Sequence, residues 1–409
     1  MRYVHRALTD ELLKAARAFG AGIVTGPRRA GKTTLLRRAF PRASYHLLQD
    51  PDAVARFRAD PQGFLDDVRL PAILDEIQNV PQILPFIRAR IDRNPSGTGS
   101  WLLTGSQEAP LMKGVTESMA GRAAVLQLLP FSAAESPKVS VLRGGFPEAV
   151  GRPASAGLWF RSYVQTYLER DVRAVTAIRD LATFRRFLAL VASRAGQMLN
   201  KTDLAAPLGV SVPTVSQWLG ILETTGQILI IPPFFENFGK RLIKSPKIHF
   251  VDAGLACHLL GIDTEAALRR SPFLGPLYEG FVASEVVKHQ LNSGRRREIY
   301  YFRDQQGLEV DLVVPAGERR LVLIEAKASR TVTPRMGAPL QRLGRDTGGY
   351  DVTALVVHPG RPGAQKTAAL LPGIRAITDD TLGTALDAAR RRPKRPHLLG
   401  DRGTARDGR

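Results

Sequence analysis

The sequence predicts a multi-domain α/β protein, and three observations support this fold class. The chain has 409 residues, which is more than one hydrophobic core normally serves. Near the N-terminus an apolar strand leads into a glycine-rich loop and a helix, and near the C-terminus apolar strands end in acidic and basic residues. A helix-turn-helix pattern lies between these regions. We therefore expect a parallel-sheet domain, a helical linker, a winged helix-turn-helix and a second α/β domain.

The glycine-rich loop has the spacing of a phosphate-binding P-loop. An apolar strand through Ile23 and Val24 leads into GPRRAGKTT, and a helix follows. Glycines let consecutive N–H groups curl around phosphate oxygens at the positive end of that helix. Lys32 is expected to reach the β and γ phosphates, and the Thr33 hydroxyl to hold Mg²⁺. The residues expected to bind ATP are Gly26, Pro27, Arg28, Arg29, Ala30, Gly31, Lys32, Thr33 and Thr34.

Acidic and polar residues end the next two apolar strands. In PAILDEIQNV, Asp75 is expected to hold Mg²⁺ through water and Glu76 to polarise the attacking water. The strand WLLTGSQ offers Thr104 and Ser106 as polar groups near the γ-phosphate. Arg122 is either an arginine finger or a structural residue; a finger would act within the chain or across the interface of a homo-oligomer.

The composition is strongly basic. The chain has 58 Lys and Arg against 38 Asp and Glu, a formal net charge of +20, which favours nucleic acid as a partner; charge scattered over the surface is the alternative. The single cysteine, Cys257, excludes an intrachain disulfide, and no Cys/His cluster has zinc-ligand spacing. No apolar run approaches membrane-spanning length and no export signal is recognisable. We expect a cytoplasmic protein with DNA, and no membrane, as a partner.

The helix-turn-helix pattern lies in NKTDLAAPLGVSVPTVSQWLGILETTGQI. A short helix meets a turn at Gly209, and Ser211 is expected to cap the second helix. That helix carries no arginine or lysine, so phosphate contact is expected rather than base reading. A rigid protein-binding or ATPase-lid module is the alternative. The residues expected to contact nucleic acid, including basic residues beside the predicted wing, are Thr214, Ser216, Gln217, Lys240, Arg241, Lys244 and Lys247.

Acidic residues gather on the C-terminal strands. EIYYFRDQQGLEVDLVV is typical of a hairpin in which Asp311 faces away from its apolar neighbours, and LVLIEAKAS carries Glu325 and Lys327 on one face. The preceding helix offers Glu279 and Glu285 on different faces, so at most one can join them, and we favour Glu279. Such carboxylates can hold Mg²⁺ while the lysine orients a bound water. The alternative is a salt-bridged strand end.

Together these motifs resemble those of the prokaryotic AAA-type P-loop ATPases that carry a C-terminal domain of unknown function. Besides the ATPase motifs, the resemblance rests on GGFPEAV, YLERDVR, NFGKRLIKSPKIHFVDAGLA and YFRDQQGLEVDLVV, and it covers nearly the whole chain. It implies an N-terminal ATPase, a winged helix, and a C-terminal fold similar to the PD-(D/E)xK nucleases. The proline of the PD pair is absent, because Val310 precedes Asp311.

We expect the domain boundaries to follow these motifs. The expected segments are an AAA-type ATPase domain over residues 1–150, a helical linker over 151–183, a winged helix-turn-helix over 184–262, a PD-(D/E)xK nuclease-like domain over 263–386 and a basic disordered tail over 387–409.

The sequence thus predicts an ATP- and Mg²⁺-dependent ATPase that engages DNA and either cleaves it or only binds it. Hydrolysis would switch the relative placement of the winged helix and the nuclease-like domain. The alternative is an ATP-gated regulatory or scaffold protein whose inactive nuclease-like module binds a protein partner. The salt dependence of DNA binding separates the two, because contacts with several phosphates weaken steeply with salt.

Overall fold

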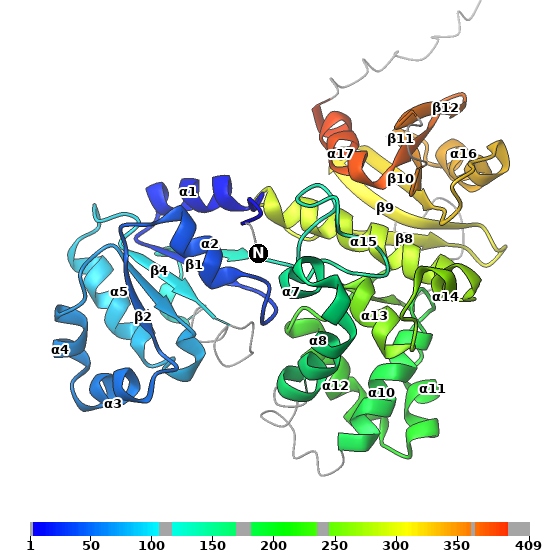
Figure 1. Cartoon of the computed structure of the whole chain (residues 1–409). Helices are drawn as coiled ribbons and strands as arrows, with labels where there is room; N and C mark the ends of the chain where they lie inside the picture. Colours follow the sequence, from blue (N-terminus) through cyan, green and yellow to red (C-terminus); the bar gives the residue numbers. More distant parts are fainter. Residues whose placement is uncertain (1–2, 106–116, 169–180, 235–244, 361–364, 392–409) are drawn as a thin grey trace, which may run out of the picture.

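The computed structural model describes residues 3–105, 117–168, 181–234, 245–360 and 365–391. These residues build a parallel sheet flanked by helices, a largely helical middle region and a C-terminal region with a mixed sheet (Figure 1). The predicted α/β, multi-domain architecture is confirmed at this level.

A five-stranded parallel sheet forms the N-terminal region, with the strand order β2-β3-β4-β1-β5. Its central strands are buried along their whole length, which explains their continuous apolar sequences. One apolar cluster joins the sheet to α1 and α2, and another joins it to α3, α4 and α5. The elements are α1 (Thr9–Ala18), β1 (Ala21–Thr25), α2 (Lys32–Ala39), β2 (Ser44–Leu47), α3 (Pro51–Ala59), α4 (Pro61–Asp66), β3 (Ala72–Asp75), α5 (Ile83–Arg93), β4 (Trp101–Thr104) and β5 (Ala123–Gln127).

The parallel register brings the carboxyl ends of three strands to one edge of this sheet. The P-loop follows β1, Asp75 ends β3 and Thr104 ends β4. Ligands of open parallel sheets bind outside the carboxyl ends of the strands. This edge is therefore where a nucleotide site is expected.

Helices dominate the middle region. Gly209, in the turn between α11 and α12, has a φ of +65°, which glycine adopts without strain. Ser211 accepts a hydrogen bond from the backbone N–H of Thr214 (3.2 Å) and caps α12, and the antiparallel pair β6 and β7 follows. The elements are α7 (Pro147–Gly151), α8 (Ala156–Tyr163), α10 (Leu181–Ser193), α11 (Lys201–Ala205), α12 (Val212–Thr224), β6 (Ile228–Ile231), β7 (Lys247–Phe250), α13 (Ala253–Leu259) and α14 (Glu265–Arg270).

The C-terminal region is a six-stranded mixed sheet with the order β12-β13-β11-β10-β9-β8. The pairs β10/β11 and β11/β13 are parallel and the other pairs are antiparallel. Helices α15 and α17 pack on one face and α16 on the other, because buried side chains alternate along β9 and β10. The elements are α15 (Leu274–Asn292), β8 (Tyr300–Arg303), β9 (Glu309–Gly317), β10 (Arg320–Ala326), α16 (Ala338–Asp346), β11 (Asp351–His358), β12 (Thr367–Leu371), β13 (Ile374–Thr378) and α17 (Leu382–Arg391).

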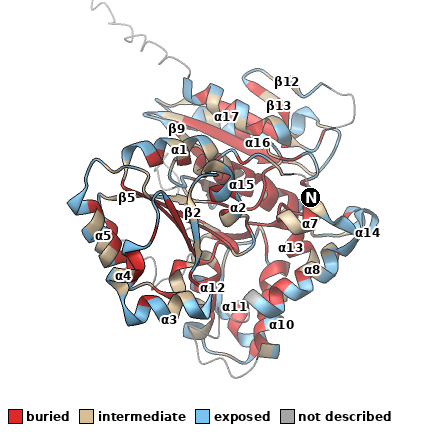
Figure 2. Ribbon diagram, turned by 60° about the vertical axis from the view of Figure 1, so that its left-hand side comes forward, coloured by how far each residue is buried: buried red, intermediate tan, exposed pale blue. Residues whose placement is uncertain are grey.

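Helix α15 joins the three regions. It is buried on most of its faces and lies in the centre of the molecule (Figure 2). One apolar cluster contains Phe131 after β5, Leu229 on β6, Phe281 on α15 and Leu312 on β9. The middle and C-terminal regions therefore share a continuous core.

The predicted start of the disordered tail at residue 387 is wrong. Helix α17 continues to Arg391, because Leu386 and Ala389 are buried against the sheet. Residues 392–409 lie outside the described residues. Among the described helices, none is both long and apolar enough to span a membrane.

Candidate functional site

The P-loop connects the end of β1 to the start of α2. Gly26 has a φ of +136°, and a Cβ there would lie 2.1 Å from the carbonyl oxygen of Leu128, so only glycine fits. The Lys32 ammonium donates to the carbonyl oxygens of Gly26 (3.1 Å) and Pro27 (3.0 Å). The lysine thus lies over the loop, as a phosphate contact requires. Arg29 has a φ of +64°, and its guanidinium lies 3.7 Å from Glu148.

Asp75 is the centre of a hydroxyl cluster. It accepts hydrogen bonds from the hydroxyls of Thr33 (2.9 Å), Tyr45 (2.7 Å) and Thr104. Burial, and then the hydrogen bond to Asp75, raise the pKa of Tyr45 well above its usual range. The Thr33 hydroxyl and the Asp75 carboxylate are adjacent oxygen ligands of the kind that Mg²⁺ prefers, so the chain fits this ion here. Tyr45 was not foreseen, because an edge-strand tyrosine carries no motif.

Glu76 faces the tip of the P-loop. Its carboxylate lies 3.8 Å from the Arg28 guanidinium and accepts a hydrogen bond from the Gln78 amide. Its backbone N–H donates to the Thr104 hydroxyl oxygen at 3.1 Å, and its φ of +61° is left-handed. Thr104 therefore touches both acids at this edge. Ser106, the other predicted polar group, lies outside the described residues.

The prediction of Arg122 as an arginine finger within the chain is wrong. Its carbonyl oxygen accepts a hydrogen bond from Ala21, at the start of β1, whereas the P-loop follows the end of that strand. Its guanidinium pairs with Asp92 at 2.5 Å. The sheet therefore separates Arg122 from the P-loop. An action across a subunit interface stays a prediction.

A cavity of about 270 Å³ lies beside the P-loop. Aromatic and apolar side chains line it together with two arginines. The lining residues are Tyr3, Val4, Arg6, Gly31, Thr34, Leu35, Arg38, Phe131 and Pro147. Arg6 was not foreseen, because its contacts are with residues far away in the sequence, such as Glu135.

The predicted C-terminal residues come together at the ends of neighbouring elements. The Lys327 ammonium lies 2.6 Å from Glu325 and 4.0 Å from Asp311, which accepts a hydrogen bond from the Ala326 N–H at 2.8 Å. Glu279 on α15 lies close enough for its charge to act on Asp311. The alternative carboxylate, Glu285, instead accepts a hydrogen bond from the backbone N–H of Ala133 and pairs with Lys288. It lies apart from Glu279, Asp311 and Glu325, which we call the acidic cluster.

Burial and neighbouring negative charges disfavour the ionised forms of the carboxylates in this cluster. Burial, followed by the charge of Glu279, raises the pKa of Asp311, and burial, followed by the charge of Asp311, raises that of Glu325. Burial alone would lower the pKa of Lys327, but the two carboxylates outweigh it and the pKa is raised. The Glu325 Oε2 atom is buried without a hydrogen-bond partner. The cluster thus holds carboxylate charge that the present contacts do not fully satisfy.

The prediction of Lys247 as a nucleic-acid contact is wrong. This side chain, the first on β7, is 2% exposed, and its ammonium lies 2.8 Å from Glu279 and 2.5 Å from Glu309. It points into the interface with α15 rather than to solvent. His249, two residues later, is fully buried, 3.5 Å from Glu279. Burial and the charge of Lys247 lower the pKa of His249 to about 3, so the imidazole is neutral.

The acidic cluster does not fit a divalent metal as it is arranged. In the described part of the chain, no three His, Cys, Asp or Glu side chains converge into a set that could hold a metal ion. Glu279, Asp311 and Glu325 have the right chemistry, but the Lys247 ammonium lies 2.8 Å from Glu279, and the Lys327 ammonium lies 2.6 Å from Glu325 and 4.0 Å from Asp311. The residues predicted to bind the metal therefore lie near one another, but they are not arranged as a set of metal ligands.

The predicted DNA-contacting helix exposes part of its polar side. Gln217 is exposed on α12, and Thr214 and Ser216 are half-buried. Lys240, Arg241 and Lys244 lie outside the described residues.

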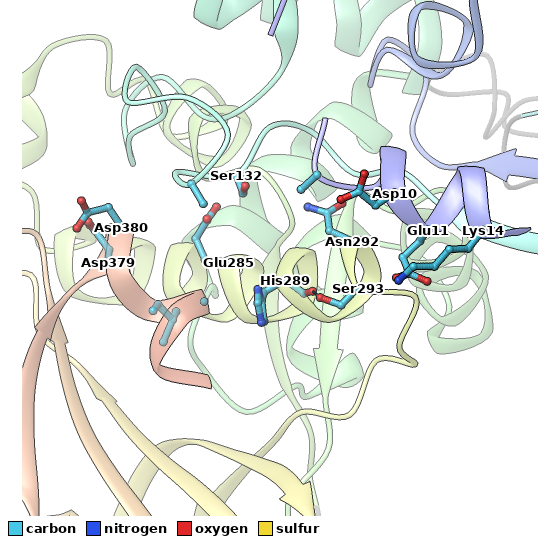
Figure 3. Close-up of a pocket in the computed structure, with 14 residues that line it drawn as sticks. Asp10, Glu11, Lys14, Ser132, Glu285, His289, Asn292, Ser293, Asp379 and Asp380 are labelled. Carbon is cyan, nitrogen blue, oxygen red and sulfur yellow. Dashed lines mark hydrogen bonds and ion pairs between the residues drawn. The ribbon is translucent and has the colours of Figure 1, made fainter. Parts of the chain in front are cut away.

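A second, acidic cavity of about 310 Å³ lies between α1, α15 and the start of α17 (Figure 3). Burial, and then the charge of Glu285, raise the pKa of Asp379 in its wall to about 6. Because the lining is acidic, this cavity is unsuited to phosphate. Sequence patterns did not indicate it, since its acids come from distant segments: Asp10, Glu11, Glu285, Asp379 and Asp380.

Three stretches of the chain match described protein families. Residues 19–136 match a family described as AAA domain, residues 135–266 match Domain of unknown function (DUF8612), and residues 274–371 match Domain of unknown function (DUF4143). The solved Walker-type ATPase PABY2304 of Pyrococcus abyssi is 15% identical, covers 62% of this chain and 94% of its own, and gives a TM-score of 0.43, which is too distant to support a shared function.

Two curated mycobacterial relatives are much closer in sequence. Uncharacterized protein Rv2008c of Mycobacterium tuberculosis and Uncharacterized protein Mb2031c of Mycobacterium bovis are each 32% identical over 328 residues, which span 78% of this chain and 72% of the relative. The chain therefore belongs to the family of these mycobacterial proteins, and in it an AAA-type P-loop ATPase domain precedes two domains of unknown function.

Proposed function

We propose that this protein is a Mg²⁺-dependent ATPase that engages DNA through its middle region and its C-terminal domain. The observation that carries the ATPase part is the 2.9 Å hydrogen bond from the Thr33 hydroxyl to Asp75 beside the P-loop lysine. Bound Mg²⁺ would supply charge neutralisation on the triphosphate. Lys32 would contact the β and γ phosphates in place of the loop carbonyls it now contacts.

Glu76 would orient and deprotonate the attacking water. Thr104 positions both acids, because its hydroxyl donates to Asp75 while its oxygen accepts the Glu76 backbone N–H. Arg28, 3.8 Å from the Glu76 carboxylate, competes with the water for this group. ATP binding, which draws Arg28 toward phosphate, would release Glu76 for the reaction.

The DNA part of the proposal rests on charge and on the arrangement of the C-terminal acids. The formal net charge of +20 favours a polyanionic partner. Asp311, Glu325 and Lys327 lie on neighbouring strands beside Glu279 on a helix, an arrangement similar to that of the PD-(D/E)xK nucleases. We therefore infer a nuclease-like C-terminal domain.

The test is DNA affinity measured at several salt concentrations, with ATP hydrolysis followed in parallel. Contacts with about three or more phosphates give a slope of log affinity against log salt of about −3 or steeper. ATP turnover that DNA stimulates would strengthen the proposal further. Absence of measurable DNA binding at low salt, with ATP turnover intact, would leave only the ATPase part standing.

A second candidate function is an ATP-gated regulator or scaffold whose C-terminal domain does not cleave DNA. The ion pair between Lys247 and Glu279, 2.8 Å long, favours it, because this contact neutralises a carboxylate that a metal would need. The partner would then be a protein. DNA binding with a steep salt dependence would count against this candidate.

A further inference from the structure

A lysine from the middle region neutralises the acidic cluster of the C-terminal region. Lys247 begins β7, within the stretch that matches DUF8612, whereas Glu279 and Glu309 belong to the stretch that matches DUF4143. The ammonium lies 2.8 Å from Glu279 and 2.5 Å from Glu309, and 5.3 Å from the centre of the Tyr301 ring. Its charge also acts on Asp311. One buried cation from another domain thus contacts one carboxylate of the cluster and Glu309, and it influences Asp311.

The same cluster contains buried polar atoms that nothing satisfies. Glu325 is 5% exposed, and its Oε2 atom has no hydrogen-bond partner. His249, also on β7, is fully buried, and both of its ring nitrogens lack a hydrogen-bond partner. Carboxylate oxygens and a neutral imidazole are ligands of divalent cations such as Mn²⁺. The cluster therefore has unused ligand atoms together with an internal cation.

We propose that Lys247 is an internal cation that takes the place of a divalent metal in the cluster of Glu279, Asp311 and Glu325, so that the cluster binds a metal only when the lysine is withdrawn. The proposal rests on the nuclease-like function inferred above. A divalent cation on these carboxylates would lie close to the Lys247 ammonium, and the two would repel each other strongly at a separation of about 4 Å in a buried site. The arrangement in which Lys247, and not a metal, neutralises these carboxylates is then the resting state of the site.

A purely structural ion pair makes a different prediction. Removing one partner from any buried ion pair is destabilising, so loss of stability alone does not separate the two roles. Lys288 provides a matched control: it is 3% exposed on α15, pairs with Glu285 at 2.9 Å and lies outside the cluster. Only the variant at Lys247 should gain metal binding.

The experiment measures Mn²⁺ binding to the full-length protein without nucleotide, by calorimetry and by the shift in melting temperature. Lys247→Met is expected to gain a Mn²⁺ site that the wild type lacks, seen as an additional binding step and a rise in melting temperature, because one repelling charge is gone. Lys288→Met is expected to bind no more than the wild type. Adding Asp311→Asn to Lys247→Met should abolish the gain.

A second measurement does not depend on the folding of the lysine variant. The wild type and Asp311→Asn should give the same Mn²⁺ isotherm, because the cluster of the wild type holds no metal. If Asp311→Asn instead loses a site that the wild type has, Lys247 does not exclude the metal and the proposal is overturned, while the metal site of the proposed function survives.

The remaining outcomes separate the inference from the proposed function. Metal binding by Lys247→Met without cleavage of linear, branched or single-stranded DNA supports the inference and removes cleavage from the proposed function. If a folded Lys247→Met binds no Mn²⁺, the ion pair is structural and both the inference and the metal-dependent nuclease are wrong.

Discussion

Arg6, in the segment before α1, contacts the P-loop and the segment after β5. The variant Arg6→Met therefore tests whether these contacts stabilise the nucleotide site. The Arg6 guanidinium donates to the carbonyl oxygens of Ala30 (2.8 Å) and Leu129 (2.6 Å) and pairs with Glu135 at 2.9 Å. The side chains of the ion pair are 4% and 3% exposed. Removal of one partner from a buried pair costs about 3–5 kcal/mol, because the other charge is left uncompensated. We expect Arg6→Met to lose stability by about that amount.

Two measurements test the Arg6→Met variant: its melting temperature and the kinetics of its ATP hydrolysis. A domain of about 150–250 residues loses about 2–4 °C per kcal/mol, so the melting temperature of the ATPase domain should fall by roughly 10 °C. Arg6 touches the loop and not the reacting atoms, so the KM for ATP should rise by about tenfold while kcat changes less. The KM effect is the one that a merely stabilising residue would not produce.

The exposed ion pair of Lys14 with Glu11 is the control. Its side chains are 67% and 27% exposed, with the charged atoms 2.7 Å apart, and Glu11→Gln should leave the melting temperature nearly unchanged because solvent screens the pair. Adding Glu135→Gln to Arg6→Met should recover part of the loss, because no buried charge is then left alone. A melting temperature within about 1 °C of the wild type and an unchanged KM for Arg6→Met would refute the reasoning.

Three further predictions concern the other sites. Lys32→Ala should abolish nucleotide binding, whereas Glu76→Gln should bind ATP and trap it unhydrolysed, as a filter-binding assay with labelled ATP would show. Charge reversal at Arg241 and Lys244 should weaken DNA binding about equally across sequences, and unchanged affinity in a titration would exclude the predicted wing as a contact. Burial raises the pKa of Asp379 to about 6, above its unfolded value, so its stabilising protonated form is complete below about pH 4 and is lost as the pH rises through 6. Asp379→Asn should therefore raise the melting temperature at pH 8, with the gain shrinking toward pH 4.

The features that the sequence predicted well depend on local chemistry. The P-loop needs a glycine at position 26 because the backbone there has a φ of +136°, which residues with a side chain rarely adopt. The turn at Gly209 and the cap at Ser211 follow from backbone rules that act over a few residues. Alternation along the strands likewise placed Asp311 beside Glu325 and Lys327.

The features that the sequence did not predict depend on contacts between distant segments. Lys247 follows a basic segment and was expected at the surface, yet its partner Glu279 is 32 residues away, on a helix of the next domain. Arg6 and Glu135 are 129 residues apart. The position of Arg122 at the wrong end of the sheet follows from strand register, which a lone arginine does not reveal.

A chain of contacts links the nucleotide loop to the acidic cluster. Pro27 in the P-loop packs against Gly226, where a Cβ would lie 3.1 Å from the proline Cγ. Gly226 lies two residues before the start of β6, which pairs with β7 so that Ile231 lies opposite Lys247. The P-loop and the acidic cluster thus contact opposite ends of one hairpin. If nucleotide binding displaces this hairpin and thereby changes the affinity of the cluster for metal, metal binding must change the affinity for nucleotide by the same factor. This follows because the coupling free energy between two binding sites is reciprocal.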